Sequence, residues 1–276
     1  MTIKSCFTPE SLEEALILKA EYGAELMVMG GGTIVMHLIN DGYLFPELAM
    51  GLRRAGMDKV QVNGTAVIGA TATLSQMTAL DSYPMLQQSA QSIAGWAIRN
   101  MGTVGGNLFA RAPYGDFGVA LLALDAQIKI QSSGQERLVP LEAFYTGGRQ
   151  LAAGELITEI HVPQSSGATQ FHKFSHRQAN APTIVAVAAQ VVLQDGRVTN
   201  ARIALGGAGQ TPIRSPAAEA ALLTALFNEQ SIQAAAAAAA EASNPITDAV
   251  ASEWYRRQMI AVQLSRTLTS MMDVPE

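Results

Sequence analysis

Two glycine-rich segments are the part of this sequence best suited to chemistry. The first is Gly30-Gly31-Gly32-Thr33, and the second is Gly102-Thr103-Val104-Gly105-Gly106-Asn107. A backbone without side chains can come close to a phosphate, and its N–H groups then donate to the anion without help from a cation. Neither segment has the spacing of the GxGxxG or GxxxxGKS/T fingerprints. Either segment alone is equally well explained as a tight turn, whereas the pair could hold one pyrophosphate from two sides.

Asp116 adds an acid a little downstream of the second segment, at the start of an expected helix. A carboxylate in that place can accept a hydrogen bond from a sugar or ribityl hydroxyl. The same position also suits a helix N-cap, which is the simpler interpretation, and the two roles are compatible.

The remaining reactive side chains do not form a recognisable site. His37 and His161 have no partners at ligand spacing, and His172 and His176 fall on an expected strand, where their spacing gives no helical metal pair. The single Cys6 cannot form an internal disulfide or supply the roughly four thiolates of an iron–sulfur cluster, and we expect it to pack as a small buried residue. No nucleophile has a supporting base. We therefore expect neither a metal site nor a catalytic residue on this chain.

Regular elements are expected on both sides of the glycine segments. An apolar run over 25–29 predicts a strand before the first segment, and the pattern over 34–39 predicts a helix after it. A helix over 85–98 is expected before the second segment and another from Asp116 onward. Strand, glycine turn and helix in that order would add the positive end of a helix dipole to the backbone donors.

The second half of the chain reads as hairpins followed by helices. Alternation over 128–139, with Ser133-Gly134 at the turn, predicts one hairpin, and 156–162 predicts an antiparallel strand. A second hairpin is expected over 182–205 around Asp195-Gly196. From Pro216 onward the pattern is helical. Gln164 to Gly167 is the best candidate for a linker between two domains.

Composition restricts the class of protein. The 276 residues carry 18 Lys and Arg against 23 Asp and Glu, so no basic surface for nucleic acid or anionic membranes is expected. No apolar run reaches the roughly 18–20 residues of a membrane span, and the N-terminus lacks a signal-peptide pattern, so we expect a cytoplasmic protein. Charged residues make up only 15%. This fits either a surface partly covered by other subunits or an alanine-rich proteome.

Several motifs in a fixed order give the sequence a family resemblance. The first glycine segment, the stretch Ile98 to Leu108, and Pro113 with Asp116 and Ala120 to Leu124 resemble the FAD-binding medium subunit of the molybdenum hydroxylases. This is the family of xanthine dehydrogenase and molybdenum-type carbon monoxide dehydrogenase. Motifs farther along the chain are similar to the same family, namely Gly154 to Ile160, Lys173 to Arg177, Leu205 to Ala208 and Glu253 to Arg257.

The resemblance implies an α+β fold. It would comprise a two-lobed FAD-binding domain of the PCMH type over residues 1–165, with a small lobe over 1–57 and a larger lobe over 58–165. A C-terminal flavoprotein domain of antiparallel sheet and helices would follow over 168–276.

The resemblance also implies which residues bind FAD. The first glycine segment with Ile34 and the second segment would hold the pyrophosphate. Asp116 would bind a hydroxyl of the FAD chain, Ile93 and Ile157 would pack on its rings, and Lys173 would lie near the polar edge of the flavin and tune its potential. The expected cofactor-binding residues are Gly30, Gly31, Gly32, Thr33, Ile34, Ile93, Thr103, Val104, Gly105, Gly106, Asn107, Asp116, Ile157 and Lys173.

The implied function is electron transfer within an oxidoreductase complex. A large molybdopterin-binding subunit would carry the molybdenum cofactor, a small subunit would carry the 2Fe-2S clusters, and FAD on this chain would pass electrons to an external acceptor. The assembly would be a dimer of heterotrimers. Two alternatives remain open: a stand-alone flavin oxidoreductase, and a non-catalytic nucleotide-binding protein in which the glycines merely turn the chain.

Overall fold

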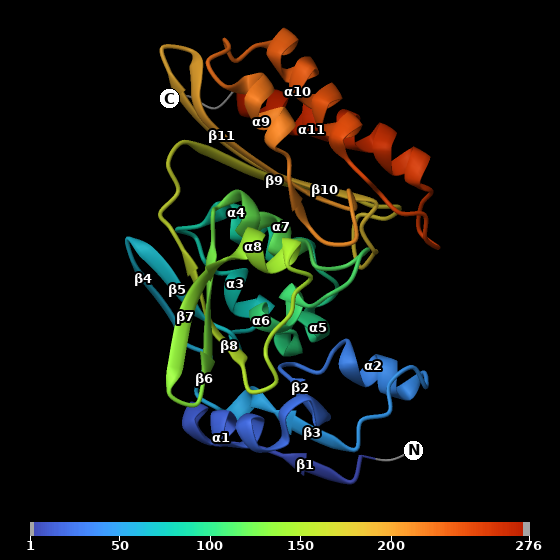
Figure 1. The fold of residues 1–276 in the computed structure, drawn as a ribbon. Coiled ribbons are helices and arrows are strands. Elements are labelled where there is room, and N and C mark those ends of the chain that lie inside the picture. Colours follow the sequence, from blue (N-terminus) through green and yellow to red (C-terminus); the bar gives the residue numbers. More distant parts are fainter. Residues whose placement is uncertain (1–2, 273–276) are drawn as a thin grey trace. The chain divides into compact units, whose positions relative to one another are not determined.

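The computed structural model describes residues 3–272, and it divides the chain into two compact units. Each unit is assembled from separate stretches of sequence. Unit 1 comprises Met1–Met77, Gly95–Ala110 and Ala126–Pro163, and unit 2 comprises Thr78–Ala94, Arg111–Asp125 and Gln164–Glu276. Figure 1 shows the elements of both units.

Unit 1 contains a small parallel sheet near the N-terminus. Its strands are β1 (Ser5–Phe7), β3 (Leu48–Gly51) and β2 (Leu26–Met29), in the order β1-β3-β2. The helices of this part are α1 (Leu12–Tyr22), the 3-10 turns η1 (Gly23–Glu25) and η2 (Leu52–Arg54), and α2 (Val35–Asn40). Ala15, Leu26 and Met50 lie in the core between helix and sheet. Strand β2, the first glycine segment and helix α2 follow one another, so the order expected around this segment is confirmed.

Helix α1 begins with a side-chain N-cap at Ser11. The Ser11 hydroxyl accepts from the Glu14 N–H, whereas the Glu14 carboxylate accepts from the Glu10 N–H and does not return to Ser11. Cys6 lies exposed on β1, so the expectation of a buried thiol was wrong. The strand is short and at the edge of its sheet, and both Ser5 and Cys6 are exposed.

The second sheet of unit 1 is antiparallel, with the order β4-β5-β8-β6-β7. Its strands are β4 (Val60–Asn63), β5 (Thr65–Gly69), β8 (Leu156–Val162), β6 (Gln127–Ser132) and β7 (Gln135–Pro140). The hairpin over 128–139 and the strand 156–162 are thus confirmed. Short helices accompany the sheet: α3 (Leu74–Met77), α5 (Trp96–Met101), α6 (Val104–Leu108) and α8 (Leu141–Thr146).

Unit 2 is built on a four-stranded antiparallel sheet in the order β12-β11-β10-β9. The strands are β9 (Ala168–Phe174), β10 (Val185–Gln194), β11 (Arg197–Gly206) and β12 (Ile213–Arg214). Asp195 and Gly196, with φ of 52° and 70°, form the two-residue turn that the sequence predicts, because both positions need left-handed backbone.

Helices pack on both faces of this sheet (Figure 1). One face carries α9 (Pro216–Leu222), α10 (Glu229–Ala242) and α11 (Glu253–Met272). The other carries α4 (Pro84–Ser92) and α7 (Asp116–Ala123), which come from the first half of the sequence. The helix expected over 85–98 is broken, because Ala94 takes a φ of 46° and the chain turns before α5 begins.

The α+β class is confirmed, since every sheet formed by residues 3–272 is accompanied by helices and two of these three sheets are antiparallel. Among the described residues, no helix combines the length and the apolarity that crossing a bilayer requires.

Candidate functional site

The first glycine segment presents a row of unused backbone donors. It leaves β2, turns at Gly32, whose φ is 71°, and enters α2. Within residues 3–272, the N–H groups of Gly31, Gly32, Thr33 and Ile34 donate no hydrogen bond, although none of these residues is fully buried by the fold. Successive free N–H groups in a turn form a concave site for an anion. α2 is a short helix, so most of this attraction comes from the N–H groups themselves.

The second glycine segment is not a loop over most of its length. Val104 to Leu108 form α6, and the Thr103 hydroxyl caps it by accepting from the Gly106 N–H at 3.2 Å. The Val104 and Gly105 N–H groups donate to the carbonyls of Ala72 and Ala70, at 2.8 and 2.9 Å. The N–H groups of Val104, Gly105, Gly106 and Asn107 are therefore committed to the fold, and the part this segment plays in holding a phosphate stays a prediction.

Glycine at 105 has a structural reason. A Cβ on Gly105 would stand 2.8 Å from the Ala70 carbonyl oxygen and 2.9 Å from its Cβ, so only glycine lets α6 lie on the backbone beside β5. The group that remains available is the Asn107 side chain, because its Oδ1 is buried and has no hydrogen-bond partner among the described residues. A buried polar atom without a partner is costly and points to a missing ligand or water.

The two glycine segments lie against each other within unit 1. A Cβ on Gly30 would stand 2.4 Å from the Thr103 Oγ1, and a Cβ on Gly31 would stand 1.7 Å from the Met101 carbonyl oxygen. A side chain at Gly31 would require the backbone at Met101 and Gly102 to move, and one at Gly30 would displace the Thr103 side chain. The segments that the sequence predicts to act together are thus in contact, and the row of free N–H groups begins where they touch.

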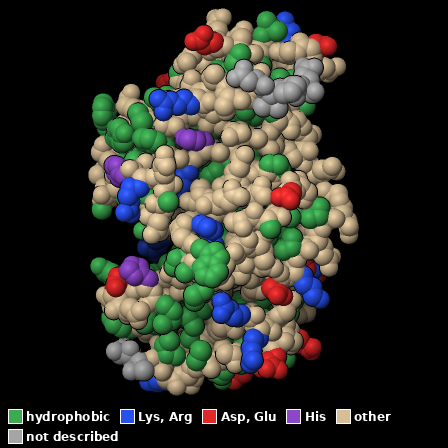
Figure 2. All heavy atoms as spheres, turned by 180° about the vertical axis from the view of Figure 1, so that it is seen from behind, with side chains coloured by type: hydrophobic (Ala, Val, Ile, Leu, Met, Phe, Trp, Pro, Cys, Tyr) green, Lys and Arg blue, Asp and Glu red, His purple; other side chains and the backbone are tan. Residues whose placement is uncertain are grey.

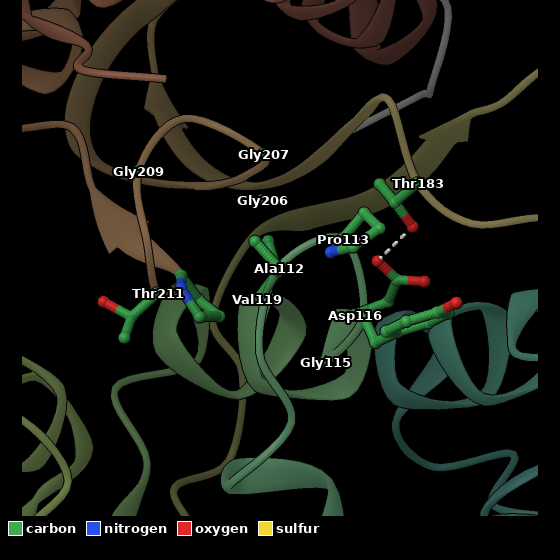
Figure 3. Close-up of a pocket in the computed structure, with 12 residues that line it drawn as sticks. Ala112, Pro113, Gly115, Asp116, Val119, Thr183, Gly206, Gly207, Gly209 and Thr211 are labelled. Carbon is green, nitrogen blue, oxygen red and sulfur yellow. Dashed lines mark hydrogen bonds between the residues drawn. The ribbon is translucent and has the colours of Figure 1, made fainter. Parts of the chain in front are cut away.

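Asp116 and Lys173, 57 positions apart, form an ion pair in unit 2. The Lys173 Nζ donates to the Asp116 Oδ2 at 2.8 Å and to the Ser92 carbonyl at 3.3 Å, and both charged side chains are largely buried. The Thr183 hydroxyl donates to the other carboxylate oxygen at 2.6 Å. Figure 3 shows this bond, with Asp116 at a small pocket beside Pro113 and Gly115. Asp116 is the first residue of α7, and Gly115 takes the N-cap position.

A second buried ion pair supports the first. Arg256 of α11 is fully buried, and its guanidinium donates to both carboxylate oxygens of Asp248 at 2.7 and 2.8 Å and to the Thr183 carbonyl at 3.1 Å. Burial of Asp248 works against its charged form, but the hydrogen bonds from Arg256 and from the Ala251 and Val250 N–H groups outweigh it and lower its pKa. Thr183 therefore links the pairs through its hydroxyl and its carbonyl.

The remaining expected residues divide between the units. Ile93 follows Ser92 in unit 2. Ile157 lies in β8 of unit 1, opposite Ile130, and is 6% exposed. Neither the Thr183 contact nor the use of the Ser92 carbonyl could be predicted from local patterns, because both contacts join chain segments that are distant in sequence.

His37, His161 and His176 each have a polar partner in the structure. His37 lies 3.3 Å from Asp41, His161 lies 2.6 Å from Glu159, and the His176 Nε2 lies 2.9 Å from the Val250 carbonyl. Over the described part of the chain, no three His, Cys, Asp or Glu side chains are placed to hold a metal ion together.

The residues of unit 1 fit a dinucleotide cofactor with a diphosphate. Four unused N–H groups supply donors for the anion, and the unpartnered Asn107 oxygen supplies an acceptor for a ligand hydroxyl or amide. Glycines at 30 and 31 keep the two segments close. In unit 2, each carboxylate oxygen of Asp116 already accepts one hydrogen bond. Each oxygen keeps a lone pair that could accept a further hydrogen bond, for example from a ligand hydroxyl.

Comparison with protein families agrees with this geometry. The family described as "FAD binding domain in molybdopterin dehydrogenase" matches residues 2–165, and "CO dehydrogenase flavoprotein C-terminal domain" matches residues 170–271. Together these two matches cover almost all of the chain.

Curated relatives are similar over most of their length. The chain is 32% identical over 274 residues to the 6-hydroxypseudooxynicotine dehydrogenase complex subunit alpha of Paenarthrobacter nicotinovorans, covering 95% of this chain and 92% of that protein. It is 29% identical to the xanthine dehydrogenase FAD-binding subunit of Escherichia coli O157:H7, covering 94% and 92%. These relatives are subunits of dehydrogenase complexes.

A solved structure shares the fold. A chain of carbon monoxide dehydrogenase from Hydrogenophaga pseudoflava superposes with a TM-score of 0.91 at 26% identity, covering 98% of each chain. The match spans both units. The chain therefore belongs to the family of FAD-binding medium subunits of the molybdenum hydroxylases.

Proposed function

We propose that this chain binds FAD through the free N–H groups of residues 31–34 and serves as the electron-transfer subunit of a molybdenum hydroxylase complex. The observation that carries the proposal is the contrast between the two glycine segments. Within residues 3–272, the first has four N–H groups without partners, whereas those of Val104, Gly105, Gly106 and Asn107 in the second are used by the fold. FAD, when bound, supplies the redox chemistry, and the residues of this chain hold it.

In this proposal the two glycine segments play different parts. The N–H groups of Gly31, Gly32, Thr33 and Ile34 donate to the diphosphate, and Gly30 keeps the segment against Thr103. The second segment, Thr103, Val104, Gly105, Gly106 and Asn107, forms the supporting wall, and the Asn107 amide offers its unpartnered oxygen to the cofactor. A backbone site of this kind needs no lysine or arginine, which agrees with the few charges of the chain.

The ring system and ribityl chain are assigned by the family resemblance. Ile93 and Ile157 would pack on the rings, Asp116 would accept from a hydroxyl, and Lys173 would lie near the polar edge of the flavin. The Lys173–Asp116 pair is nearly neutral as a whole, so its effect on the flavin depends on which member is nearer. The domain division at residues 165–168 is likewise a proposal, supported by the boundaries of the two family matches.

The partners follow from the names of the relatives. Names such as "dehydrogenase complex subunit alpha" and "carbon monoxide dehydrogenase medium chain" indicate larger and smaller companions. We infer a large subunit with the molybdenum cofactor and a small subunit with 2Fe-2S clusters, which this chain with its single cysteine cannot hold. A dimer of such heterotrimers and an external electron acceptor complete the proposal.

The test is to load the purified chain with FAD and add candidate substrates with and without co-expressed partner subunits. The proposal expects the flavin to stay oxidised when the chain is alone and to be reduced only in the complex. Reduction of the flavin by an organic substrate in the isolated chain would instead establish a stand-alone oxidoreductase. Failure to take up FAD would contradict the proposal and would support the alternative in which the glycine segments only turn the chain.

A further inference from the structure

Arg149 has a backbone conformation that is costly for an arginine. It lies in the turn after α8, where Gly148 and Arg149 take left-handed φ angles of 76° and 60°. Among the described residues of unit 1, Arg149 is the one residue other than glycine with a positive φ. The Cβ of an L-residue disfavours this region, so glycine would be expected here. An arginine kept at this position therefore indicates a use for its side chain.

The Arg149 guanidinium contacts the end of the second glycine segment. Its Nη1 donates to the carbonyl oxygens of Phe109 and Ala110, at 3.0 and 2.8 Å. Phe109 is the C-cap of α6, and Arg149 lies 40 and 39 positions farther along the chain from these two residues. Carbonyl groups at the end of a helix have no partner within the helix, and a cationic side chain is well suited to them. A guanidinium fixed on two of them therefore holds the end of α6.

Asn107 is the residue of α6 that this contact helps to fix. Its Oδ1 is buried and has no hydrogen-bond partner within residues 3–272. Its backbone N–H donates to the Thr103 carbonyl at 3.0 Å, and its own carbonyl accepts from the Ala110 N–H at 3.1 Å. Ala110 is thus bonded to Asn107 through its N–H and to Arg149 through its carbonyl. Movement of Ala110 would therefore shift the turn that carries the Asn107 amide.

Helix α6 needs support at this end because it is short. Its five residues cannot form a stable helix without tertiary contacts. At the N-terminal end, the Val104 and Gly105 N–H groups are bonded to the backbone that follows β5. At the other end, the contacts include those of Arg149 and an edge-to-face contact between the rings of Phe109 and Phe144, whose centroids are 5.6 Å apart. The Arg149 hydrogen bonds are charge-assisted and are thus the stronger restraint at this end.

We propose that Arg149 is a positioning residue for the cofactor, which holds the end of α6 so that the Asn107 amide is presented to FAD. The inference rests on the proposed function, in which Asn107 offers its unpartnered oxygen to the cofactor. Arg149 acts through Ala110 and Asn107 and does not itself bind FAD. Its loss should therefore weaken FAD binding only as long as the Asn107 side chain is present.

The test is a double-mutant cycle of Arg149→Gly and Asn107→Ala, with the Kd of FAD for the flavin-free chain measured by flavin fluorescence. Glycine suits the φ of 60°, so Arg149→Gly removes the guanidinium without adding backbone strain. It should raise the Kd by about tenfold, because two charge-assisted hydrogen bonds are lost. In the Asn107→Ala chain, the same change should raise the Kd by less than about twofold, because the effects of residues that act through one contact do not add.

A second variant and stability data separate positioning from general support of the fold. Arg149→Lys keeps a cation that can donate to the carbonyls, and it should bring the Kd back to within about threefold of the original value. Urea unfolding of the same variants reports on the fold. If Arg149 only stabilised the fold, Arg149→Gly would raise the Kd by the same factor with and without the Asn107 side chain.

A matched control removes one positive charge elsewhere in unit 1. FAD is an anion, and charged side chains are sparse on the face shown in Figure 2, so the loss of any cation could weaken binding in general. The Arg54 side chain is 70% exposed and lies 3.6 Å from Glu10. Arg54→Gln should leave the Kd of FAD unchanged, and a rise equal to that of Arg149→Gly would overturn the inference.

Three further results would overturn it. These are an unchanged Kd in Arg149→Gly, an effect of equal size in the Asn107→Ala chain, and an Asn107→Ala chain that binds FAD as tightly as the original. If the unaltered chain binds no FAD, the proposed function fails together with this inference, and the flavin content of that chain distinguishes this case from the other three.

Discussion

The Lys173–Asp116 pair is the single-residue feature that most directly concerns a bound flavin. Replacing Lys173 by Met leaves a largely buried carboxylate without its cation. If the pair adjoins the flavin, this uncompensated negative charge disfavours the reduced, anionic ring. We expect the midpoint potential to fall by about 30 mV or more, which for a two-electron couple corresponds to about 1.4 kcal/mol. Spectroelectrochemical titration measures it, and an unchanged potential would remove Lys173 from the flavin site.

A change at Thr183 tests whether its hydroxyl helps to position the Lys173–Asp116 pair. Thr183→Val keeps the shape of the side chain but removes the hydroxyl that donates to Asp116. The carboxylate charge is then balanced by Lys173 alone, so we expect a smaller downward shift of the same potential, restored by Thr183→Ser. A full effect of Lys173→Met with no effect of Thr183→Val would show that Thr183 has no positioning role.

Gly31 is the point at which the two glycine segments are in closest contact, so its substitution tests their packing. The Met101 carbonyl lies where a Cβ would be, so Gly31→Ala forces the segments apart and costs about 1–3 kcal/mol. We expect weaker FAD retention together with a lower urea midpoint. Gly51→Ala is the matched control in the same unit, because nothing lies within 4 Å of its Cβ position. Equal flavin content in both variants would contradict the account of the segments.

At the scale of elements, α11 is tied to the loop before β10 by Arg256. Asp248→Asn leaves that guanidinium buried without its counter-charge, and the loss of one partner of a buried pair typically costs about 3–5 kcal/mol. Urea unfolding at pH 7 measures the change. Glu47→Gln, which breaks the exposed Lys4–Glu47 pair, should change the free energy of unfolding by less than about 1 kcal/mol.

The same pair predicts a pH dependence. Because the pKa of Asp248 is lowered in the folded state, its contribution to stability is present above the ordinary pKa of an aspartate and is lost as the pH falls through the folded value. Stability should therefore decline below about pH 4, and Asp248→Asn should flatten that decline. A decline of the same steepness in the variant would assign it to other carboxylates.

The elements also show what sequence reasoning can reach. The Asp195-Gly196 turn and the strand 156–162 are local patterns and were predicted correctly. The helical form of residues 104–108 depends on close packing against distant backbone at Ala70, and no local pattern predicts it. Gly105 and Gly106 look like phosphate-binding glycines in sequence, whereas their N–H groups serve the fold.

At the scale of the whole molecule, the order of motifs identified the family, but the site contacts could not be read from it. The Lys173–Asp116 pair and the Thr183 link each join residues tens of positions apart. The two compact units interleave along the chain, with 78–94 and 111–125 belonging to unit 2. Sequence periodicity cannot reveal such exchange, because each segment has the pattern of an ordinary helix in either unit.

The most direct test of the account compares FAD with riboflavin in binding to the flavin-free chain, followed by flavin fluorescence. If the N–H groups of residues 31–34 hold the diphosphate, one FAD should bind per chain, and riboflavin, which has no phosphate, should bind at least about a hundredfold more weakly, or about 2.7 kcal/mol. Riboflavin binding as tightly as FAD, or a chain that binds neither, would contradict the account.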